Sequence, residues 1–261
     1  RRESNMGVVL AIAQQTVNEA FRRRIVIVFL VCGLFLIALG PVFGFLSPKD
    51  SQTVLRSLGL AAILLTGLFI TIVTCIYLIP VEIERRTIYT ILSKPVQRFE
   101  FVLGKFLGGF AIVFVNIALL GIVFLIMLRF QEHKIPVDML KGVILTFFQM
   151  MLLAALTIFF STFATPVLNF FMSFGIFIVG NLSSVTESLT TSKVKVTQMV
   201  GTVIHYLLPN FGNFNIQNSL IHPTVEVTNE AVFIRNNIIY ALIYSAVLLI
   251  LAVIIFDRRE V

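Results

Sequence analysis

The sequence is poor in charged residues and contains no tryptophan. Only 13% of its 261 residues are Asp, Glu, Lys or Arg, and 58% are hydrophobic. A typical soluble domain has about 25% charged residues. This composition excludes a water-soluble core and indicates an integral membrane protein. Because tryptophan is absent, an aromatic belt at the membrane interface has to consist of tyrosine and phenylalanine.

Cysteine and histidine are scarce as well. Cys32 and Cys75 both fall inside apolar runs, where we expect small buried side chains without a disulfide or metal role. The three histidines, His133, His205 and His222, lie in predicted loops and lack the spacing of metal ligands. We therefore expect no metal and no cofactor to be bound by this chain.

The sequence also lacks the motifs of ATP binding and of hydrolysis. Gly104-Lys105 is followed by Phe106 and has no glycine five residues upstream, so it is not a phosphate loop. Neither the G-x-S-x-G pattern of a serine hydrolase nor the H-E-x-x-H pattern of a zinc protease is present. We expect the chain itself to be no enzyme.

What the sequence does contain is six long apolar runs, which predict an all-α membrane protein. The predicted spans cover about 25–45, 58–79, 102–128, 139–163, 167–182 and 236–256, forming a transmembrane domain over 25–256. Residues 1–24 are a tail and an amphipathic helix that ends in three arginines and suits the membrane surface. In the third span, Gly104 and Gly108 form a small-xxx-small pair that permits close helix contact.

No Asp or Glu falls within the six predicted spans. Ion-coupled transporters and intramembrane proteases usually need ionisable groups at this depth, so both are disfavoured. The polar residues at depth are mild, and hydrogen bonding between helices is the favoured interpretation, with a substrate pathway as the alternative. The possible pathway-lining residues are Thr71, Thr74, Asn116, Asn169 and Ser173.

The distribution of positive charge predicts the orientation of the spans. With the N-terminus in the cytoplasm, twelve Lys and Arg residues lie inside and eight outside, as the positive-inside rule expects. Both termini, the loop 81–101 and the tail 257–261 are then cytoplasmic. The segment 183–235 is extracytoplasmic and is expected to hold a short amphipathic or re-entrant helix ended by Pro209. This layout fits a multi-pass protein of the cell membrane.

The loop 81–101 carries the most specific pattern. Ile88, Ile91 and Leu92 share one helical face in a segment bounded by charge and stopped by Pro95. A permanently exposed apolar surface below the membrane is a liability, so we expect it to dock into a partner. The alternative is an ordinary interfacial loop held by snorkelling basic residues.

This loop resembles the first cytoplasmic loop of the type 2 ABC-transporter permease family. The residues that carry the resemblance are Glu82, Glu84, Thr87, Leu92, the run Ser93-Lys94-Pro95-Val96-Gln97-Arg98, and Gly104-Lys105. The segment Thr16 to Arg24 is similar to the elbow helix of that family. The stretch Leu208-Pro209-Asn210-Phe211 before the last span and the basic C-terminal end are similar too.

The resemblance implies a permease subunit of an ATP-driven transporter, in most members an exporter. It implies a coupling helix that docks on a separate ATPase subunit, which binds ATP and Mg²⁺. It also implies two such ATPases and a second permease copy, identical or related. The residues to which it assigns ATPase coupling are Glu84, Arg85, Arg86, Thr87, Ile88, Tyr89, Ile91, Leu92, Ser93, Lys94, Pro95 and Arg98.

Other functions remain open at this point. A membrane-embedded scaffold or assembly factor would have the same helices without transport. A secondary transporter or channel would need ionisable residues at depth or inverted repeats, and a membrane enzyme would need a nucleophile or a metal site. The net charge of +7 suggests nucleic-acid binding, but the basic residues flank apolar runs and are better explained as topology signals.

Overall fold

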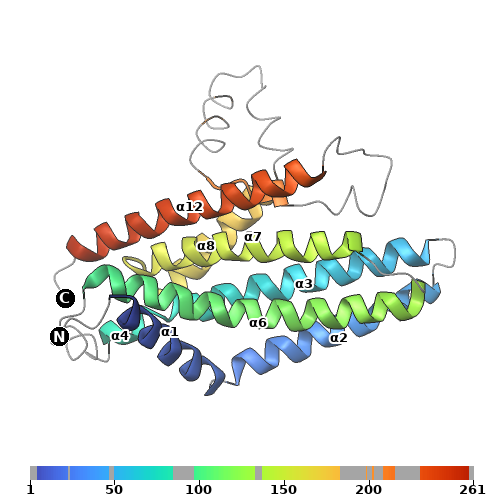
Figure 1. The fold of residues 1–261 in the computed structure, drawn as a ribbon, viewed down its shortest axis with the longest axis horizontal. Coiled ribbons are helices and arrows are strands. Elements are labelled where there is room, and N and C mark those ends of the chain that lie inside the picture. Colours follow the sequence, from blue (N-terminus) through green and yellow to red (C-terminus); the bar gives the residue numbers. More distant parts are fainter. Residues whose placement is uncertain are drawn as a thin grey trace.

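The structure is a computed structural model that describes residues 5–22, 24–46, 50–84, 97–132, 137–182, 198, 202, 208–214 and 230–258. It is a bundle of long helices that run roughly along one axis (Figure 1). The long helices are α2 (Ile25–Leu46), α3 (Ser51–Ile76), α6 (Arg98–Glu132), α7 (Val137–Ser161) and α12 (Glu230–Arg258). The shorter elements are α1 (Asn5–Arg22), α4 (Pro80–Glu84), α8 (Pro166–Asn181) and the 3₁₀ turn η1 (Phe211–Phe214).

The described part of the chain confirms the all-α membrane fold. Five of its helices, α2, α3, α6, α7 and α12, are long and apolar enough to cross a membrane. The sixth predicted span coincides with α8, which has only 16 residues. At 1.5 Å per residue this helix measures roughly 24 Å, short of the roughly 30 Å of a hydrocarbon core.

The bounds of α3 differ from the prediction at both ends. The helix starts at Ser51, before the predicted span 58–79, and in its second turn Ser57 Oγ donates to the carbonyl of Thr53 at 2.8 Å. It ends at Ile76 rather than Ile79, and a turn follows. The predicted span 58–79 ended just before Pro80, and in the structure Pro80 begins α4, because the first turn of a helix needs no proline N–H.

Two predicted loops are shortened by helices that extend beyond the apolar core. The loop 81–101 contains α4 at its start and the first turn of α6 at its end. The last six residues of the predicted segment 183–235, residues 230–235, belong to α12. Hydropathy marks where a helix leaves the hydrocarbon region, whereas the helix itself continues for as long as its backbone hydrogen bonds are satisfied.

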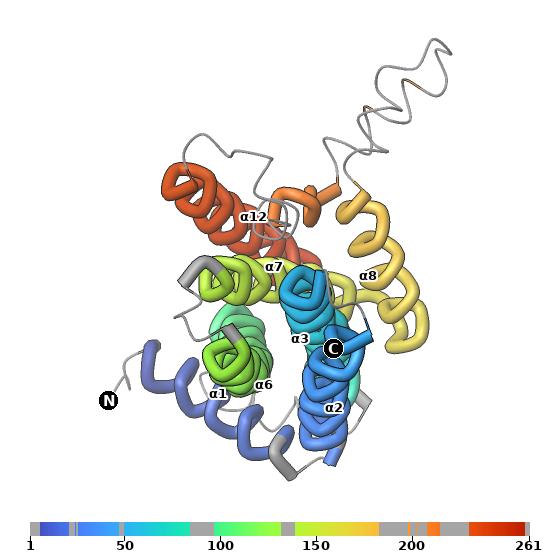
Figure 2. The backbone as a smooth tube through the Cα atoms, turned by 90° about the vertical axis from the view of Figure 1, so that its right-hand side faces the viewer, coloured from blue at the N-terminus to red at the C-terminus, as the bar shows by residue number. Residues whose placement is uncertain are grey.

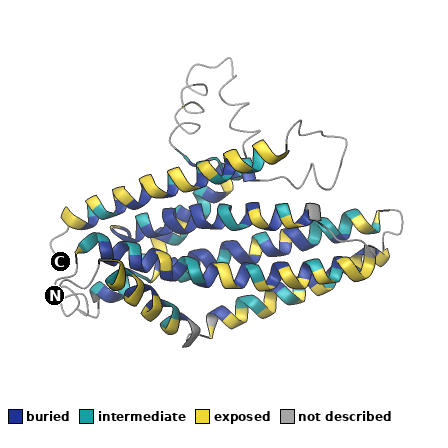
Figure 3. Ribbon diagram, viewed as in Figure 1, coloured by how far each residue is buried: buried dark blue, intermediate teal, exposed yellow. Residues whose placement is uncertain are grey.

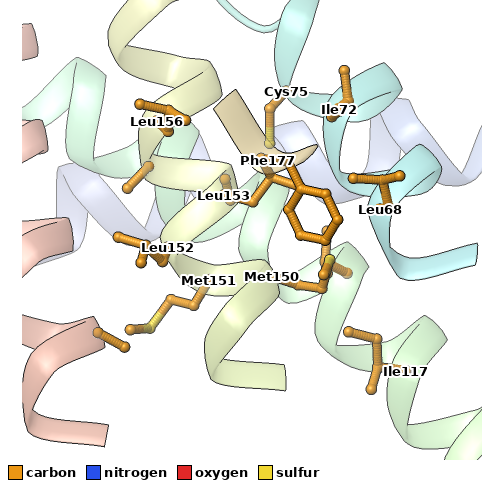
Figure 4. Packing of buried hydrophobic residues seen from close by; sticks show 14 of the residues in the cluster. Leu68, Ile72, Cys75, Ile117, Met150, Met151, Leu152, Leu153, Leu156 and Phe177 are labelled. Atoms are coloured by element: carbon orange, nitrogen blue, oxygen red, sulfur yellow. The ribbon is translucent and has the colours of Figure 1, made fainter. Parts of the chain in front are cut away.

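The core surrounds α7. Residues 150–156 of this helix are all buried, as expected for a helix covered on every side. Figure 4 shows Phe177 of α8 between Leu153 of α7 and Leu68 of α3, while Leu152 points to the other side of α7, toward α12. Viewed end-on, α3 and α7 lie inside the bundle, while α1 and α8 lie on opposite sides of it (Figure 2).

The outer faces of the bundle are apolar. Large hydrophobic side chains are exposed along α2 and α12 (Figure 3), among them Val28 and Phe35 on α2 and Ile243 and Ile250 on α12. Such faces fit lipid contact. Cys75 is buried as predicted, but the prediction that Cys32 is buried is wrong, since it lies exposed on α2.

Candidate functional site

The ends of the predicted coupling loop lie at one end of the bundle. We call this the proximal end and define it by α4, the first turns of α6 and the last turn of α12. In Figure 1 these elements gather near both chain termini. The structure thus brings the start of α1, the end of α12 and the described ends of the loop to the same end of the bundle.

Most residues assigned to coupling lie outside the described part of the chain. These residues are Arg85, Arg86, Thr87, Ile88, Tyr89, Ile91, Leu92, Ser93, Lys94 and Pro95. Of the other two, Glu84 is the last residue of α4 and Arg98 is the first of α6. The coupling role of the whole set stays a prediction, and the structure shows how the two ends of the loop are held.

The start of the loop is attached to α6 by a buried ion pair. Lys105 Nζ lies 2.7 Å from Glu82 Oε1, and the exposed fractions of the two side chains are 3% and 11%. Lys105 Nζ also lies 5.7 Å from the centre of the Phe101 ring. Because removing one partner of a buried pair leaves an uncompensated charge, this contact holds α4 firmly against α6.

The end of the loop is fixed by a capping arrangement at the start of α6. The backbone N–H of Gln97 donates to Glu100 Oε2 at 2.9 Å, so the carboxylate in the first turn satisfies an otherwise unpaired donor. Glu100 is almost fully buried. Its negative charge also suits the positive end of the helix dipole.

Arg98 joins the same turn to the end of α12. Its Nη1 donates to the carbonyl oxygens of Phe256 and Asp257, each at 2.8 Å, and its Nε lies 3.6 Å from Asp257 Oδ1. Beneath it the rings of Phe101 and Phe256 stack with centres 5.8 Å apart. The guanidinium group thus binds the carbonyls that the last turn of α12 leaves unpaired.

The amphipathic helix α1 packs closely against α6. A methyl group added at Gly104 would come within 2.8 Å of Ile12 Cβ, and one at Gly108 within 2.6 Å of Thr16 Cβ and 2.9 Å of the Ala13 carbonyl oxygen. The predicted small-xxx-small contact is confirmed, and α1 is its partner. Ile12, Ala13, Thr16 and Ala20 form the buried face of α1, as its pattern predicts.

A pocket opens where α1, α2, α3, α4 and α6 meet. Its lining residues are Thr16, Glu19, Ala20, Val26, Val73, Thr74, Tyr77, Leu78, Val81, Glu82 and Lys105. The pocket therefore lies beside the buried ion pair and next to the start of the loop. Thr74 is the predicted pathway residue that reaches it.

The other predicted pathway residues lie deeper in the bundle. Asn169 Nδ2 donates to the carbonyl of Thr157 at 3.0 Å, and Ser173 Oγ donates to Asn169 Oδ1 at 2.9 Å. Both residues are fully buried within the chain, so helix packing explains these two bonds. Thr71 Oγ1 and the side-chain polar atoms of Asn116 are buried without a hydrogen-bond partner in the described part of the chain. A pathway role for the set stays a prediction.

A second set of polar contacts holds the segment 208–214. Gln149 Nε2 donates to the carbonyl of Phe211 at 3.1 Å, and the backbone N–H of Asn210 donates to Tyr240 Oη at 2.9 Å. Asn237 Nδ2 donates to the carbonyl of Asn213 at 2.8 Å. The Leu208–Phe211 stretch is thereby packed among α7, α8 and α12, and the predicted helix before Pro209 lies largely outside the described residues.

The sequence analysis did not predict which residues pair at the two ends of the loop or around the segment 208–214. Lys105 was noted only beside Gly104, and Glu82 only as part of an acidic pair. The two are 23 positions apart, and Arg98 is 158 positions from Phe256. The one available signal was a lysine beyond the first turn of a span, where a buried cation requires a partner.

Comparison with known proteins agrees with this arrangement. Residues 10–261 match the family described as ABC-2 family transporter protein. No protein of curated function matches the chain. The match covers nearly the whole length and includes α1, the predicted coupling loop and α12. The chain therefore belongs to the ABC-2 transporter family, and it is a multi-pass membrane permease component of an ABC transporter.

Proposed function

We propose that this permease is part of an ATP-driven exporter and that a separate ATPase subunit drives it through residues 84–98. The observation that supports this most directly is the anchoring of the loop at both ends. The Glu82–Lys105 ion pair holds its start on α6, and the capped first turn of α6 holds its end. Because both ends of the loop are fixed, a displacement of the loop moves the helices of the bundle and is not absorbed by a rearrangement of the loop itself.

The coupling residues act by differential contact. A ligand shifts a conformational equilibrium only by as much as its contacts with the two states differ. In this proposal the apolar face formed by Ile88, Ile91 and Leu92 sits in a groove of the ATPase, and ATP binding moves that groove. The partner ATPase binds ATP and Mg²⁺, so the permease needs no cofactor of its own.

The assembly we propose contains two permease chains and two ATPases in the cell membrane, with both permease termini in the cytoplasm. The substrate passes between the two permease chains, whose polar residues at depth line its path. The exposed apolar faces of the bundle leave room for both a second copy and lipid. Export rather than import follows the direction common in the resembling family.

The first experiment is purification of the permease from its native host in mild detergent, followed by mass spectrometry. We expect a soluble ATPase with a phosphate loop to co-purify with the unsubstituted chain and to be lost with Leu92→Asp. Gln131→Asp, at an exposed position on α6 at the other end of the bundle, is the matched control and should retain the ATPase.

The scaffold or assembly factor is the competing function. It predicts that no ATPase co-purifies with the unsubstituted chain, or that the ATPase is retained equally by Leu92→Asp. Either result would contradict coupling to an ATPase through residues 84–98 without contradicting the membrane fold.

A further inference from the structure

We infer that Arg98 is a positioning residue that makes the last span, α12, move together with the coupling loop. This inference rests on the proposed function, because it assumes that an ATPase displaces the loop. It gives Arg98, one of the residues assigned to ATPase coupling, a role within the permease chain itself. In the structure its guanidinium group is directed to another helix of the same chain.

The contacts of Arg98 involve the backbone of α12 more than its side chains. One nitrogen, Nη1, binds the carbonyl oxygens of both Phe256 and Asp257 at 2.8 Å. The ion pair to Asp257 is longer, at 3.6 Å, and the Asp257 side chain is 72% exposed. Because the two carbonyls belong to the main chain, the attachment follows the end of α12 itself and persists when the Asp257 carboxylate is removed.

Aromatic packing stiffens the same junction. The Arg98 guanidinium lies 5.9 Å from the centre of the Phe256 ring, and that ring stacks on Phe101. Phe101 and Phe256 are both almost fully buried. The residues following the loop and the last turn of α12 thus form one packed unit, which displaces as a whole because a close-packed contact does not deform gradually.

The arrangement gives the loop a route to a helix distant in sequence. Along its length α12 packs largely on α7 through apolar side chains, and such surfaces can slide past one another. The two hydrogen bonds from Arg98 are directional and hold the end of α12 in a fixed position relative to α6. A displaced loop therefore pulls α12 through Arg98.

Distance measurement between spin labels tests the inference in the intact complex. In a Cys32→Ser, Cys75→Ser background, Val167→Cys on α8 and Ile254→Cys on α12 carry the labels, since both positions are exposed and α8 packs on α7 and α3 rather than on the unit formed by α6 and the end of α12. We expect ATP with vanadate to shift the label distance in the permease–ATPase complex. Arg98→Gln should abolish the shift, Arg98→Lys should retain part of it, and Asp257→Asn should retain nearly all.

The outcomes separate this inference from the proposed function. If no ATPase co-purifies, coupling itself fails. If Arg98→Gln binds the ATPase and still shows the full shift, or if Asp257→Asn loses it, Arg98 does not act through the backbone of α12 and the inference is overturned. An absent shift in the unsubstituted complex with bound ATPase overturns it as well. Equal yield and elution volume of Arg98→Gln and Arg98→Lys exclude misfolding as the cause of a loss.

Discussion

The proximal end of the bundle differs in its chemistry from the distal half, which contains the starts of α7 and α12 and the turn η1 (Figure 1). At the proximal end the best shielded contact is charged, since the Lys105 side chain is only 3% exposed in its pair with Glu82. In the distal half the buried contacts are neutral, as between Gln149 and the carbonyl of Phe211. The distal ion pair of Lys141 with Glu230 is exposed, with side-chain exposed fractions of 29% and 44%.

In the proposed function, this difference separates the region that receives force from the ATPase from the region that rearranges. Removing one partner of a buried ion pair lowers stability by about 3–5 kcal/mol, whereas an exposed pair contributes only about 0–1 kcal/mol to stability. The strong contacts surround the two ends of the coupling loop. The distal half is held by contacts that reorganise at lower cost.

The largest effect is expected from Lys105→Met. The change removes the ammonium group that pairs with the buried Glu82 carboxylate, and we expect a loss of about 3–5 kcal/mol in stability. Thermal unfolding of the purified protein in detergent measures it. The double variant Lys105→Met, Glu82→Leu should recover much of the loss, because no buried charge remains. Equal stability of the single and double variants would show that the pair is not buried in the membrane-bound protein.

A smaller effect is expected from Gly108→Ala, at the contact between α1 and α6. The added methyl group would lie 2.6 Å from Thr16 Cβ, so α1 has to move away. Overpacking of this kind costs about 1–3 kcal/mol. Gly175→Ala on α8 is the matched control, because no atom lies within 4 Å of its added methyl group. Unfolding curves of the two variants should differ, and coinciding curves would contradict the close packing of α1 on α6.

The smallest effect is expected from Lys141→Gln in the distal half. Its ion pair with Glu230 is exposed to solvent, so the change in stability should stay within about 1 kcal/mol. Raising the salt concentration should remove the difference between the variant and the unsubstituted protein, because exposed charges are screened. A loss comparable to that of Lys105→Met would erase the distinction between the two regions.

Local patterns in the sequence predicted much of the fold. The amphipathic face of α1, the break between the spans 139–163 and 167–182, and the close contact at Gly104 and Gly108 follow from the hydrophobic pattern and from residue size. The predicted starts and ends of the helices were less accurate, because hydropathy reports the membrane boundary rather than the end of a helix. The predicted span 58–79 ends before Pro80, whereas a proline at this position also starts a helix, as it does in α4.

For the candidate site, too, the sequence predicted a local feature but not the contacts between distant residues. The apolar face of the coupling loop was predicted from spacing, and that part of the chain lies outside the described residues. The contacts that hold the loop were not predicted. A pattern read along the chain shows which residues share a helix face, but it does not show which helix lies opposite that face.

The sequence by itself determined that this chain crosses a membrane as a set of helices, because each apolar run of about 20 residues must satisfy its backbone internally in lipid. It also determined which face of α1 is apolar. Only the tertiary structure decided that Glu82 pairs with Lys105 and that Arg98 caps α12. Those partners are separated by 23 and 158 positions, and the packing of α6 against its neighbours brings them within hydrogen-bonding distance.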